Sequence, residues 1–432
     1  MTSSRTPYPA LRAVLVIVAL CTATACGLTG SGSGDTDGAG GPDRRATPTR
    51  SASPTPGTPT PSTTTATPSA TTTSPTPSAR ATPPSLTRRA TPRPTASRRP
   101  AARPAGPARP VVAGTIAKGL TTPWDLAFLP DGSALLSERD TARVDRVTPG
   151  GKVGTVGRVP GVVHEGEGGL LGLALSPHYS RDHLLYAYIT TRTDNRVVRM
   201  TYDGTGLGPP EAVFTGIPRG PQHHNGGRLR FGPDGYLYVP TGDGEQRARA
   251  QNRSSLGGKI LRITANGKPA PGNPFGTAVW TYGHRNVEGL VFDPQGRLWA
   301  SEFGDKAADE LNRIRAGGNY GWPVLEGRGG ARRGYVDPLA QWPTDDASPS
   351  GLTYADGSMW LASLRGERLW RVPVAGGRVT GASKAFLVGT YGRLRHVARA
   401  PDGSLWLLTN NTDGRVSPRP GDDRILRLRL TR

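Results

Sequence analysis

Short apolar runs separated by turns recur along the chain from residue 111 onward. In each unit an apolar run leads to a turn rich in Pro, Asp and Gly, and a second apolar run follows; one copy is residues 228–231, Pro233-Asp234-Gly235 and residues 236–239. Asp-Gly between two such runs is a strong β-hairpin signal, because glycine adopts the positive φ that the turn needs. The first runs of the six copies lie at residues 124–128, 171–175, 228–231, 288–292, 351–354 and 396–398.

The spacing of these hairpins indicates the fold. Successive turns lie about 46 to 61 residues apart, the length of one four-stranded propeller blade. Most copies are followed by a third strand-like run, such as residues 142–147 or 368–372. A β-sandwich or barrel is the alternative, but those folds do not repeat one hairpin unit six times. We therefore predict an all-β, six-bladed β-propeller over residues 111–432.

Residues 26–110 differ sharply in composition from the rest. They consist mainly of Ser, Thr, Pro, Gly, Ala and Arg, with almost no large apolar side chain. Such a segment cannot bury enough apolar surface to offset the entropy cost of ordering. Frequent proline keeps it extended. We predict a disordered Ser/Thr/Pro/Arg-rich tether here.

The first 25 residues predict an export signal. Arg5 and Arg12 flank its positive region, and residues 13–21 form an apolar stretch too short to span a bilayer. The following Ala23-Thr24-Ala25-Cys26 resembles a bacterial lipobox, which predicts a lipoprotein signal peptide over residues 1–25 and lipidation of Cys26. Ordinary cleavage without lipidation is the alternative. Cys21 would leave with the signal, so the mature chain would contain no disulfide.

The net charge of the chain excludes few classes of binding partner. The chain has 54 basic and 33 acidic residues, a formal net charge of +21. A diffuse excess of this kind suits anionic envelope polymers or anionic small molecules. No basic helix or nucleic-acid signature accompanies it, so we expect no nucleic-acid partner.

The polar loops between the apolar runs are the candidate site. In a propeller the loops at one end converge on the central channel, and they determine function. Polar side chains cluster just before the first run of several units, at residues 164–169, 215–227, 281–286 and 389–395, and a further loop spans residues 304–312.

Four motifs in these loops, taken together, resemble those of a known family. They are His-His-Asn-Gly-Gly-Arg-Leu at 223–229, Gly-His-Arg-Asn at 283–286, Ser-Glu-Phe-Gly at 301–304 and Gly-Gly-Asn-Tyr-Gly-Trp-Pro at 317–323. Their order over residues 115–430 resembles the soluble dehydrogenases for glucose and aldose sugars that depend on pyrroloquinoline quinone (PQQ), also called the glucose/sorbosone dehydrogenase family.

The resemblance implies oxidation of an aldose at C1 to the lactone, by hydride transfer to the quinone. His224 matches the family's base, and histidine suits removal of the hydroxyl proton because its ordinary pKa lies near neutrality. Arg285 matches the residue that stabilises negative charge on the reduced quinone carbonyl. The glucose enzymes have an Asp before the base, where this chain has His223. Either the proton handling differs, or another acid orients the base.

The resemblance also implies a PQQ site. PQQ is a planar tricarboxylate, and the planar fork of arginine suits carboxylates. Arg393 and Arg395 match the family's paired cofactor arginines, and their i, i+2 spacing places both on one face of a strand. Arg285 and Asn286 match the pair beside the quinone. Two further cofactor positions differ from the family, with Glu167 for the usual Gln and Arg365 for Lys. An ionised Glu167 would repel the cofactor unless it is paired.

Calcium is the metal that the family binds. The matching segment offers carbonyl oxygens of Gly304 and Asp305, while Glu310 and Tyr320 would complete a second site. Calcium prefers carboxylate and carbonyl oxygens. Asp305 stands where the family has Pro.

These expectations combine into one hypothesis. The chain would be a lipid-anchored enzyme on the outer face of the cytoplasmic membrane, attached through Cys26. It would oxidise a small-molecule sugar and pass electrons to an unidentified envelope acceptor. The alternative is a non-enzymatic propeller of the cell envelope that binds carbohydrate or protein.

Overall fold

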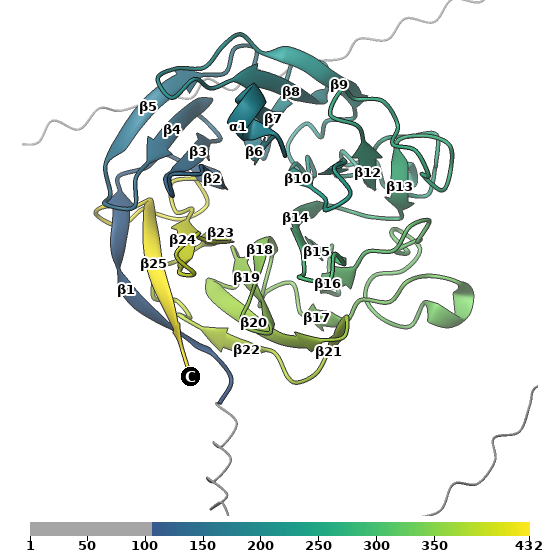
Figure 1. The fold of residues 1–432 in the computed structure, drawn as a ribbon. Helices are drawn as coiled ribbons and strands as arrows, with labels where there is room; N and C mark the ends of the chain where they lie inside the picture. The colour runs from purple at the N-terminus through teal and green to yellow at the C-terminus, as the bar shows by residue number, and fades with distance from the viewer. Residues whose placement is uncertain (1–105) are drawn as a thin grey trace, which may run out of the picture. The chain divides into compact units, whose positions relative to one another are not determined.

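The computed structural model describes residues 106–432 (Figure 1). The predicted signal peptide, Cys26 and the part of the predicted tether up to residue 105 lie outside the described residues. No helix within residues 106–432 is long and apolar enough to cross a membrane.

Six antiparallel sheets stand around a common axis, which confirms the predicted six-bladed propeller (Figure 1). Each of the first three sheets follows chain order from the axis outward. The first contains β2 (Pro123–Phe128), β3 (Ala134–Glu138), β4 (Arg143–Val147) and β5 (Val153–Arg158). The second contains β6 (Leu170–Leu175), β7 (Leu184–Thr190), β8 (Asn195–Thr201) and β9 (Glu211–Ile217), with the short helix α1 (Tyr179–Asp182) between β6 and β7. The third contains β10 (Arg230–Phe231), β11 (Leu237–Pro240), β12 (Lys259–Ile263) and β13 (Val279–Tyr282).

The next two sheets repeat this order. The fourth contains β14 (Val287–Phe292), β15 (Leu298–Glu302), β16 (Asp309–Arg313) and β17 (Ala340–Trp342). The fifth contains β18 (Pro349–Ala355), β19 (Ser358–Ser363) and β20 (Arg368–Ala375), and both β21 (Arg378–Val379) and β22 (Lys384–Phe386) pair with β20. Two 3₁₀ turns, η1 (Arg247–Ala250) and η2 (Ala331–Arg333), lie in connecting loops. All six predicted hairpins are the first two strands of a blade.

The sixth blade closes the ring with strands from both ends of the domain. Its order is β23 (Leu394–Arg399), β24 (Leu405–Thr409), β25 (Arg424–Thr431) and β1 (Arg109–Lys118). The pairing of β1 with β25 runs from Arg109 opposite Thr431 to Lys118 opposite Arg424. β1 thus begins at Arg109, within the stretch predicted as tether. The carbonyl oxygen of Ala108 already accepts a hydrogen bond from Arg371 Nη1 at 2.6 Å.

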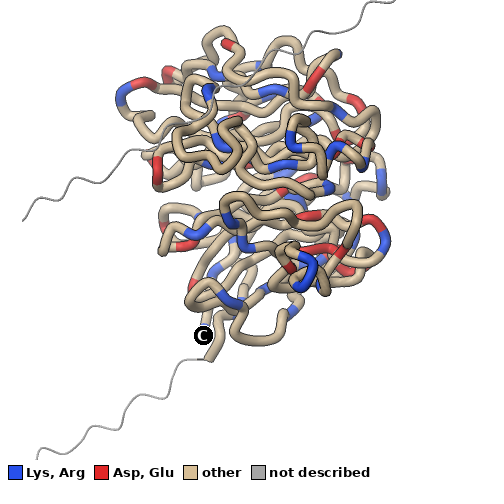
Figure 2. Tube along the Cα trace, turned by 90° about the vertical axis from the view of Figure 1, so that its right-hand side faces the viewer, with Lys and Arg blue, Asp and Glu red and all other residues tan. Residues whose placement is uncertain are grey.

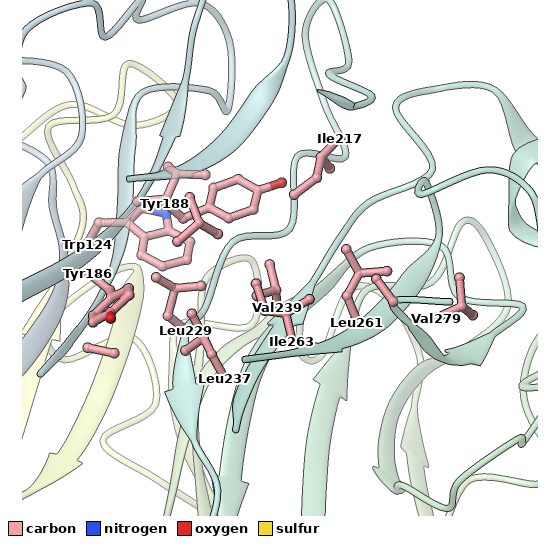
Figure 3. Packing of buried hydrophobic residues seen from close by; sticks show 14 residues of the cluster. Trp124, Tyr186, Tyr188, Ile217, Leu229, Leu237, Val239, Leu261, Ile263 and Val279 are labelled. Carbon is pink, nitrogen blue, oxygen red and sulfur yellow. The ribbon is translucent and has the colours of Figure 1, made fainter. Parts of the chain in front are cut away.

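The core lies between neighbouring blades. Figure 3 shows one such cluster, in which Leu229, Val239, Leu261 and Val279 follow one another outward along the third blade, with Trp124 close to the axis. These side chains are almost completely buried. Burying one side chain of this size contributes about 1.5–3 kcal/mol, so the interfaces between blades hold the ring together. Charged residues of both signs are interspersed along the side of the ring (Figure 2).

The innermost strands give the propeller two distinct ends. The loops that precede β6, β10, β14, β18 and β23 all contribute to one cavity. The second halves of the same strands, near the hairpin turns, line another cavity at the opposite end. A buried polar chain lies between the two cavities: Arg228 pairs with Asp125 at 2.7 Å, and Arg395 pairs with Glu288 at 2.6 Å.

Candidate active site

The cavity at the entry end of the innermost strands gathers most of the predicted site residues. It has a volume of about 580 Å³. Its lining is strongly charged, with five arginines and four carboxylates. The charged and histidine residues are Glu167, His223, His224, Glu245, Arg247, Arg285, Asp305, Asp309, Arg365, Arg393 and Arg415. We refer to it as the axial cavity.

His224 forms a carboxylate–imidazole pair that the sequence did not reveal. Its Nδ1 lies 2.7 Å from Oδ1 of Asp243, which is fully buried, whereas the His224 side chain retains 14% exposure. The other oxygen of Asp243 accepts a hydrogen bond from Trp322 Nε1 at 2.8 Å. Burial opposes ionisation of Asp243, but the hydrogen bond and charge of His224 outweigh it, so the pKa of Asp243 is lowered. An ionised Asp243 only accepts, so Nδ1 of His224 is the donor, and in the neutral form of the ring Nε2 is the basic atom.

Tight backbone turns hold this pair together. His224 has a φ of 61°, a left-handed conformation that is uncommon outside glycine. Its carbonyl oxygen would lie 1.9 Å from a Cβ at Gly242, so only glycine fits beside it. On the same loop, Gly226 donates its N–H to Oδ1 of Asn286 at 2.9 Å.

Glu245 joins the two loops that carry the pair. Its Oε1 accepts the backbone N–H of Gln222 at 2.7 Å and also that of His223. Its own backbone N–H donates to Oδ1 of Asp243 at 2.8 Å. Glu245 therefore positions the loop of His224 relative to its carboxylate partner.

His223 does not share this arrangement. Its side chain is 51% exposed, and Nδ1 lies 3.7 Å from Oε1 of Glu245, beyond hydrogen-bonding distance. His223 stands where the glucose enzymes have an Asp. In this chain the acid that contacts His224 is instead Asp243, which lies on a separate loop.

Glu167 is paired in the structure. Its carboxylate accepts Arg415 Nη2 at 3.1 Å and the backbone N–H of His224 at 3.1 Å. Burial opposes the charge, but Arg415 and the His224 backbone outweigh it, so the pKa of Glu167 is lowered. Arg415 thus supplies the pairing that an ionised Glu167 requires.

The predicted cofactor arginines occupy different depths. Arg285 lines the axial cavity, pairs with Asp305 at 3.1 Å, and leaves its buried Nε without a hydrogen-bond partner. Arg393 lines the cavity and pairs with Asp413 at 3.0 Å. Arg365 lies at the rim, 61% exposed, and pairs with Asp345.

Arg395 and Asn286 lie behind the cavity rather than along it. A register shift between Leu394 and His396 interrupts the regular alternation of β23, so Arg393 and Arg395 do not both line the cavity as their spacing predicted. Arg395 is instead buried against Glu288. Asn286 is also buried, and its Nδ2 lies 3.4 Å from Oε1 of Glu288.

The predicted metal segment surrounds a second, much smaller hollow beside the axial cavity. Its lining includes Gly304, Glu310, Tyr320 and also Glu302, while Asp305 lines the axial cavity itself. The hydroxyl of Tyr320 is already engaged, because it donates to Arg313 O and accepts from Arg315 N, both at 2.9 Å.

Two carboxylates face one another at this hollow. Glu302 and Glu310 are opposite each other in the β15–β16 pairing, and Nδ2 of Asn312 bonds to both of them, at 3.3 and 2.8 Å. Burial and the charge of Glu302 raise the pKa of Glu310 to about 8. The residues from 106 to 432 contain no group of three His, Cys, Asp or Glu side chains placed to hold a metal, so a cation here would also need backbone oxygens.

The functional candidates that sequence reasoning missed are Asp243, Glu245, Glu302, Asp309 and Arg415. Asp243 offered one usable signal: it lies in Thr241-Gly242-Asp243-Gly244, directly after the second strand of the blade whose entry loop carries His224. Asp309 accepts the backbone N–H groups of Gly304 and Ser348, and burial raises its pKa to about 7.

Comparison with known proteins gives consistent matches. The family model described as Glucose / Sorbosone dehydrogenase matches residues 120–418. Aldose sugar dehydrogenase YliI of Escherichia coli (strain K12) is 30% identical over 339 residues, covering 69% of this chain and 91% of that protein. Quinoprotein glucose dehydrogenase B of Acinetobacter calcoaceticus is 33% identical over 250 residues, covering 49% of this chain and 52% of that protein. The PQQ-bound structure of aldose sugar dehydrogenase from Streptomyces coelicolor is 55% identical, with a TM-score of 0.73, and covers 76% of this chain and 100% of that one.

Proposed function

The chain belongs to the glucose/sorbosone dehydrogenase family, and we propose that it oxidises an aldose sugar at C1 to the lactone, with PQQ as cofactor and Ca²⁺ as metal. The observation that carries this proposal is the His224–Asp243 pair, with its 2.7 Å contact, in the wall of an arginine-lined cavity.

The donor set of the axial cavity fits PQQ. A planar tricarboxylate needs forked cationic donors, and Arg285, Arg365, Arg393 and Arg415 all line the cavity. The buried Nε of Arg285 has no hydrogen-bond partner within residues 106–432, which suits an arginine that completes its hydrogen bonds on a ligand. When bound, PQQ supplies the acceptor for the hydride that leaves C1.

His224 is the base in this proposal. Its unprotonated Nε2 takes the proton of the C1 hydroxyl, which gives an imidazolium. Asp243 fixes the tautomer before the transfer and stabilises the positive charge after it. Glu245 holds the loop of His224 in place through its bonds to Gln222 and His223. Arg285 provides the positive charge at the position where negative charge develops.

The chemistry of the small hollow suits Ca²⁺. Burial, and after it the charge of Glu302, raises the pKa of Glu310, and a divalent cation would offset both by supplying positive charge beside the two carboxylates. Glu302 and Glu310 would hold the ion together with backbone carbonyls such as that of Gly304. Tyr320 lies alongside with its hydroxyl already bonded to backbone groups.

The experiment that tests this function uses the full chain, purified and stripped of metal with EDTA. PQQ and Ca²⁺ are added, bound quinone is followed by its absorption, and dye reduction is measured with a panel of aldoses. We expect saturable PQQ binding and sugar-dependent dye reduction that requires Ca²⁺. Failure to bind PQQ at micromolar concentration would contradict the proposed enzymatic function. It would favour a non-enzymatic propeller that binds carbohydrate or protein.

A pair of histidine variants separates catalysis from cofactor binding. His224→Gln is expected to abolish turnover while PQQ still binds, because the basic nitrogen is lost and the cavity keeps its arginines. The matched control is His223→Gln, on the exposed neighbour. Full activity in His224→Gln would refute the assignment of the base.

The proposal extends to the location of the enzyme. Lipidation at Cys26 would hold it on the outer face of the cytoplasmic membrane, near the envelope acceptor of its electrons. Cys26→Ser is expected to move the protein from the membrane fraction into the medium, and an unchanged membrane fraction would argue against the anchor.

A further inference from the structure

A second cavity lies at the end of the propeller axis opposite to the candidate active site. Its volume is about 330 Å³, and all six innermost strands, β2, β6, β10, β14, β18 and β23, contribute to its wall. They do so with the parts of the strands nearer the hairpin turns, whereas residues preceding all of these strands except β2 belong to the axial cavity. We refer to it as the distal cavity.

The wall of the distal cavity is mostly apolar, and its charged side chains are all basic. Phe128, Leu173, Phe231 and Leu352 supply large apolar surfaces, and Val291 and Val397 lie among them. The ionisable side chains of the lining are Arg230, Arg399 and His396, and no Asp or Glu lines it. Low-dielectric walls with charges of one sign concentrate the electrostatic potential and attract ions of opposite sign.

Asp125, the carboxylate that contacts Arg230, does not neutralise it. Asp125 is fully buried and pairs with Arg228 Nη1 at 2.7 Å. It also accepts the backbone N–H of Leu126 at 2.8 Å and of Leu173 at 3.1 Å. Its contacts with Arg230 are long, at 3.4 and 3.5 Å. One carboxylate therefore faces two arginines, and the shorter contact belongs to Arg228.

Arg230 consequently keeps donor capacity toward the cavity. A guanidinium has five N–H donors. Within the described part of the chain, Arg230 bonds, besides the long contacts with Asp125, only to backbone carbonyls, at 2.7 Å to Leu229 O and at 3.4 Å to Leu173 O. Its side chain is 24% exposed. Arg399 adds a second, exposed cation at the same end.

His396 does not add to this charge. It is completely buried, with Nε2 at 3.2 Å from Asp125 Oδ1. Gly351 packs closely against its ring, since a Cβ at that position would lie 1.9 Å from Nδ1. Burial and the neighbouring Arg228 hold the pKa of His396 well below its ordinary value, so the ring is neutral. The positive charge of the lining therefore comes from Arg230 and Arg399.

We propose that the distal cavity binds a small organic carboxylate, with its carboxylate on Arg230 and Arg399 and its apolar body against Phe128, Phe231 and Leu352. An arginine fork gives a carboxylate two parallel hydrogen bonds. The aromatic and aliphatic wall can bury an apolar body, a contact that a small inorganic anion does not offer. This site is separate from the one assigned to PQQ.

Benzoate is a suitable probe, and the full chain without added PQQ is the protein to test by calorimetric titration. Binding is expected to be saturable. Arg230→Gln should weaken it by about tenfold or more, since a hydrogen bond to a charged group contributes about 1.5–3 kcal/mol. Benzamide, which lacks the charge, should bind more weakly by a similar factor. Arg393→Gln, in the axial cavity, is the matched control and should leave benzoate affinity unchanged.

Several outcomes would overturn the proposal. They are absence of benzoate binding, equal affinity in Arg230→Gln, or a loss of affinity in Arg393→Gln that places benzoate among the cofactor arginines. Phosphate binding as tight as benzoate would overturn the apolar part of the site. If Arg230→Gln does not fold, Arg399→Gln provides the test, because its side chain is exposed and outside the core. An unchanged affinity in Arg399→Gln would then refute the site.

Discussion

Replacing Asp243 with asparagine is expected to remove the basicity of His224 while leaving the cavity intact. Asp243 accepts three hydrogen bonds, from His224 Nδ1 at 2.7 Å, from the backbone of Glu245 at 2.8 Å and from Trp322 Nε1 at 2.8 Å. Asparagine replaces one oxygen with an NH₂ group. If that group faces Trp322, two donors meet. If it faces His224, the ring must accept at Nδ1, and the proton moves to Nε2, the atom that has to act as base.

The size of the effect follows from these contacts. A hydrogen bond to a charged group contributes about 1.5–3 kcal/mol, which is about 10- to 150-fold in rate. Holding a catalytic histidine in the wrong tautomer can cost up to about 10⁴-fold. We therefore expect kcat of Asp243→Asn to fall by about 10² to 10⁴, with PQQ affinity nearly unchanged, because no cofactor arginine pairs with Asp243.

The assay is dye reduction by the PQQ- and Ca²⁺-loaded full chain, together with a PQQ titration of the same preparation. His223→Gln serves as control, since His223 is exposed and makes no contact with Asp243; its kcat should stay within about threefold of the wild type. A kcat of Asp243→Asn close to that of the wild type would show that Asp243 does not set the basicity of His224. This role of Asp243 would also be refuted if loss of bound PQQ explained the whole decrease.

Variants at three further positions test the surroundings of the pair. Glu245→Ala should lower kcat by about tenfold, because the backbone N–H groups of the His224 loop lose their acceptor. Glu245→Gln should keep most activity, because its amide oxygen still accepts those hydrogen bonds. Equal rates of the two variants in steady-state kinetics would contradict the role of Glu245 in positioning the loop. Glu167→Gln should tighten PQQ binding by about three- to tenfold, because Arg415 loses its carboxylate partner and can turn to the cofactor; a fluorescence titration that shows weaker binding would argue against it. The pKa of Asp309 is about 7 in the folded chain and about 4 in the unfolded chain. Between these two pH values only the folded state keeps the proton on Asp309. The free energy of unfolding therefore falls as the pH rises from about 4 to 7, and it levels off above pH 7. Asp309→Asn should remove on the order of 2–4 kcal/mol of that fall, measured by denaturant titration at about pH 5 and 8, and an unchanged fall would show that another group causes it.

The fold could be predicted because its signal is local and repeated. Each blade begins with a hairpin whose strands and turn lie within about 20 residues, and binary patterning with turn chemistry is sufficient to identify such a unit. The closure of the sixth blade could not be predicted from the sequence, because β1 and β25 are more than 300 residues apart and neither contains a turn signal. Arg109 was accordingly assigned to the tether although it begins a strand.

The candidate site could be predicted only in part. The histidine and arginine positions came from motifs that are contiguous in the chain. Asp243 and Arg415 were missed because their partners lie in other loops, 19 and 248 residues away. The depth of Arg395 was missed because a register shift at Leu394 changes which side chains share a face. Such facts depend on tertiary geometry, which no local pattern specifies.

The closure of the ring by β1 and β25 has a consequence for how the protein is made. Five blades are built from strands that are consecutive along the chain, so each can form as soon as its own segment is available. The sixth sheet needs both β1 and β25, the first and the last strand within residues 106–432. During synthesis the propeller therefore stays an open arc with two unpaired blade faces until β25 has left the ribosome. Truncation by a single strand at the C-terminus would leave that arc permanently open, with β1 unpaired at one edge.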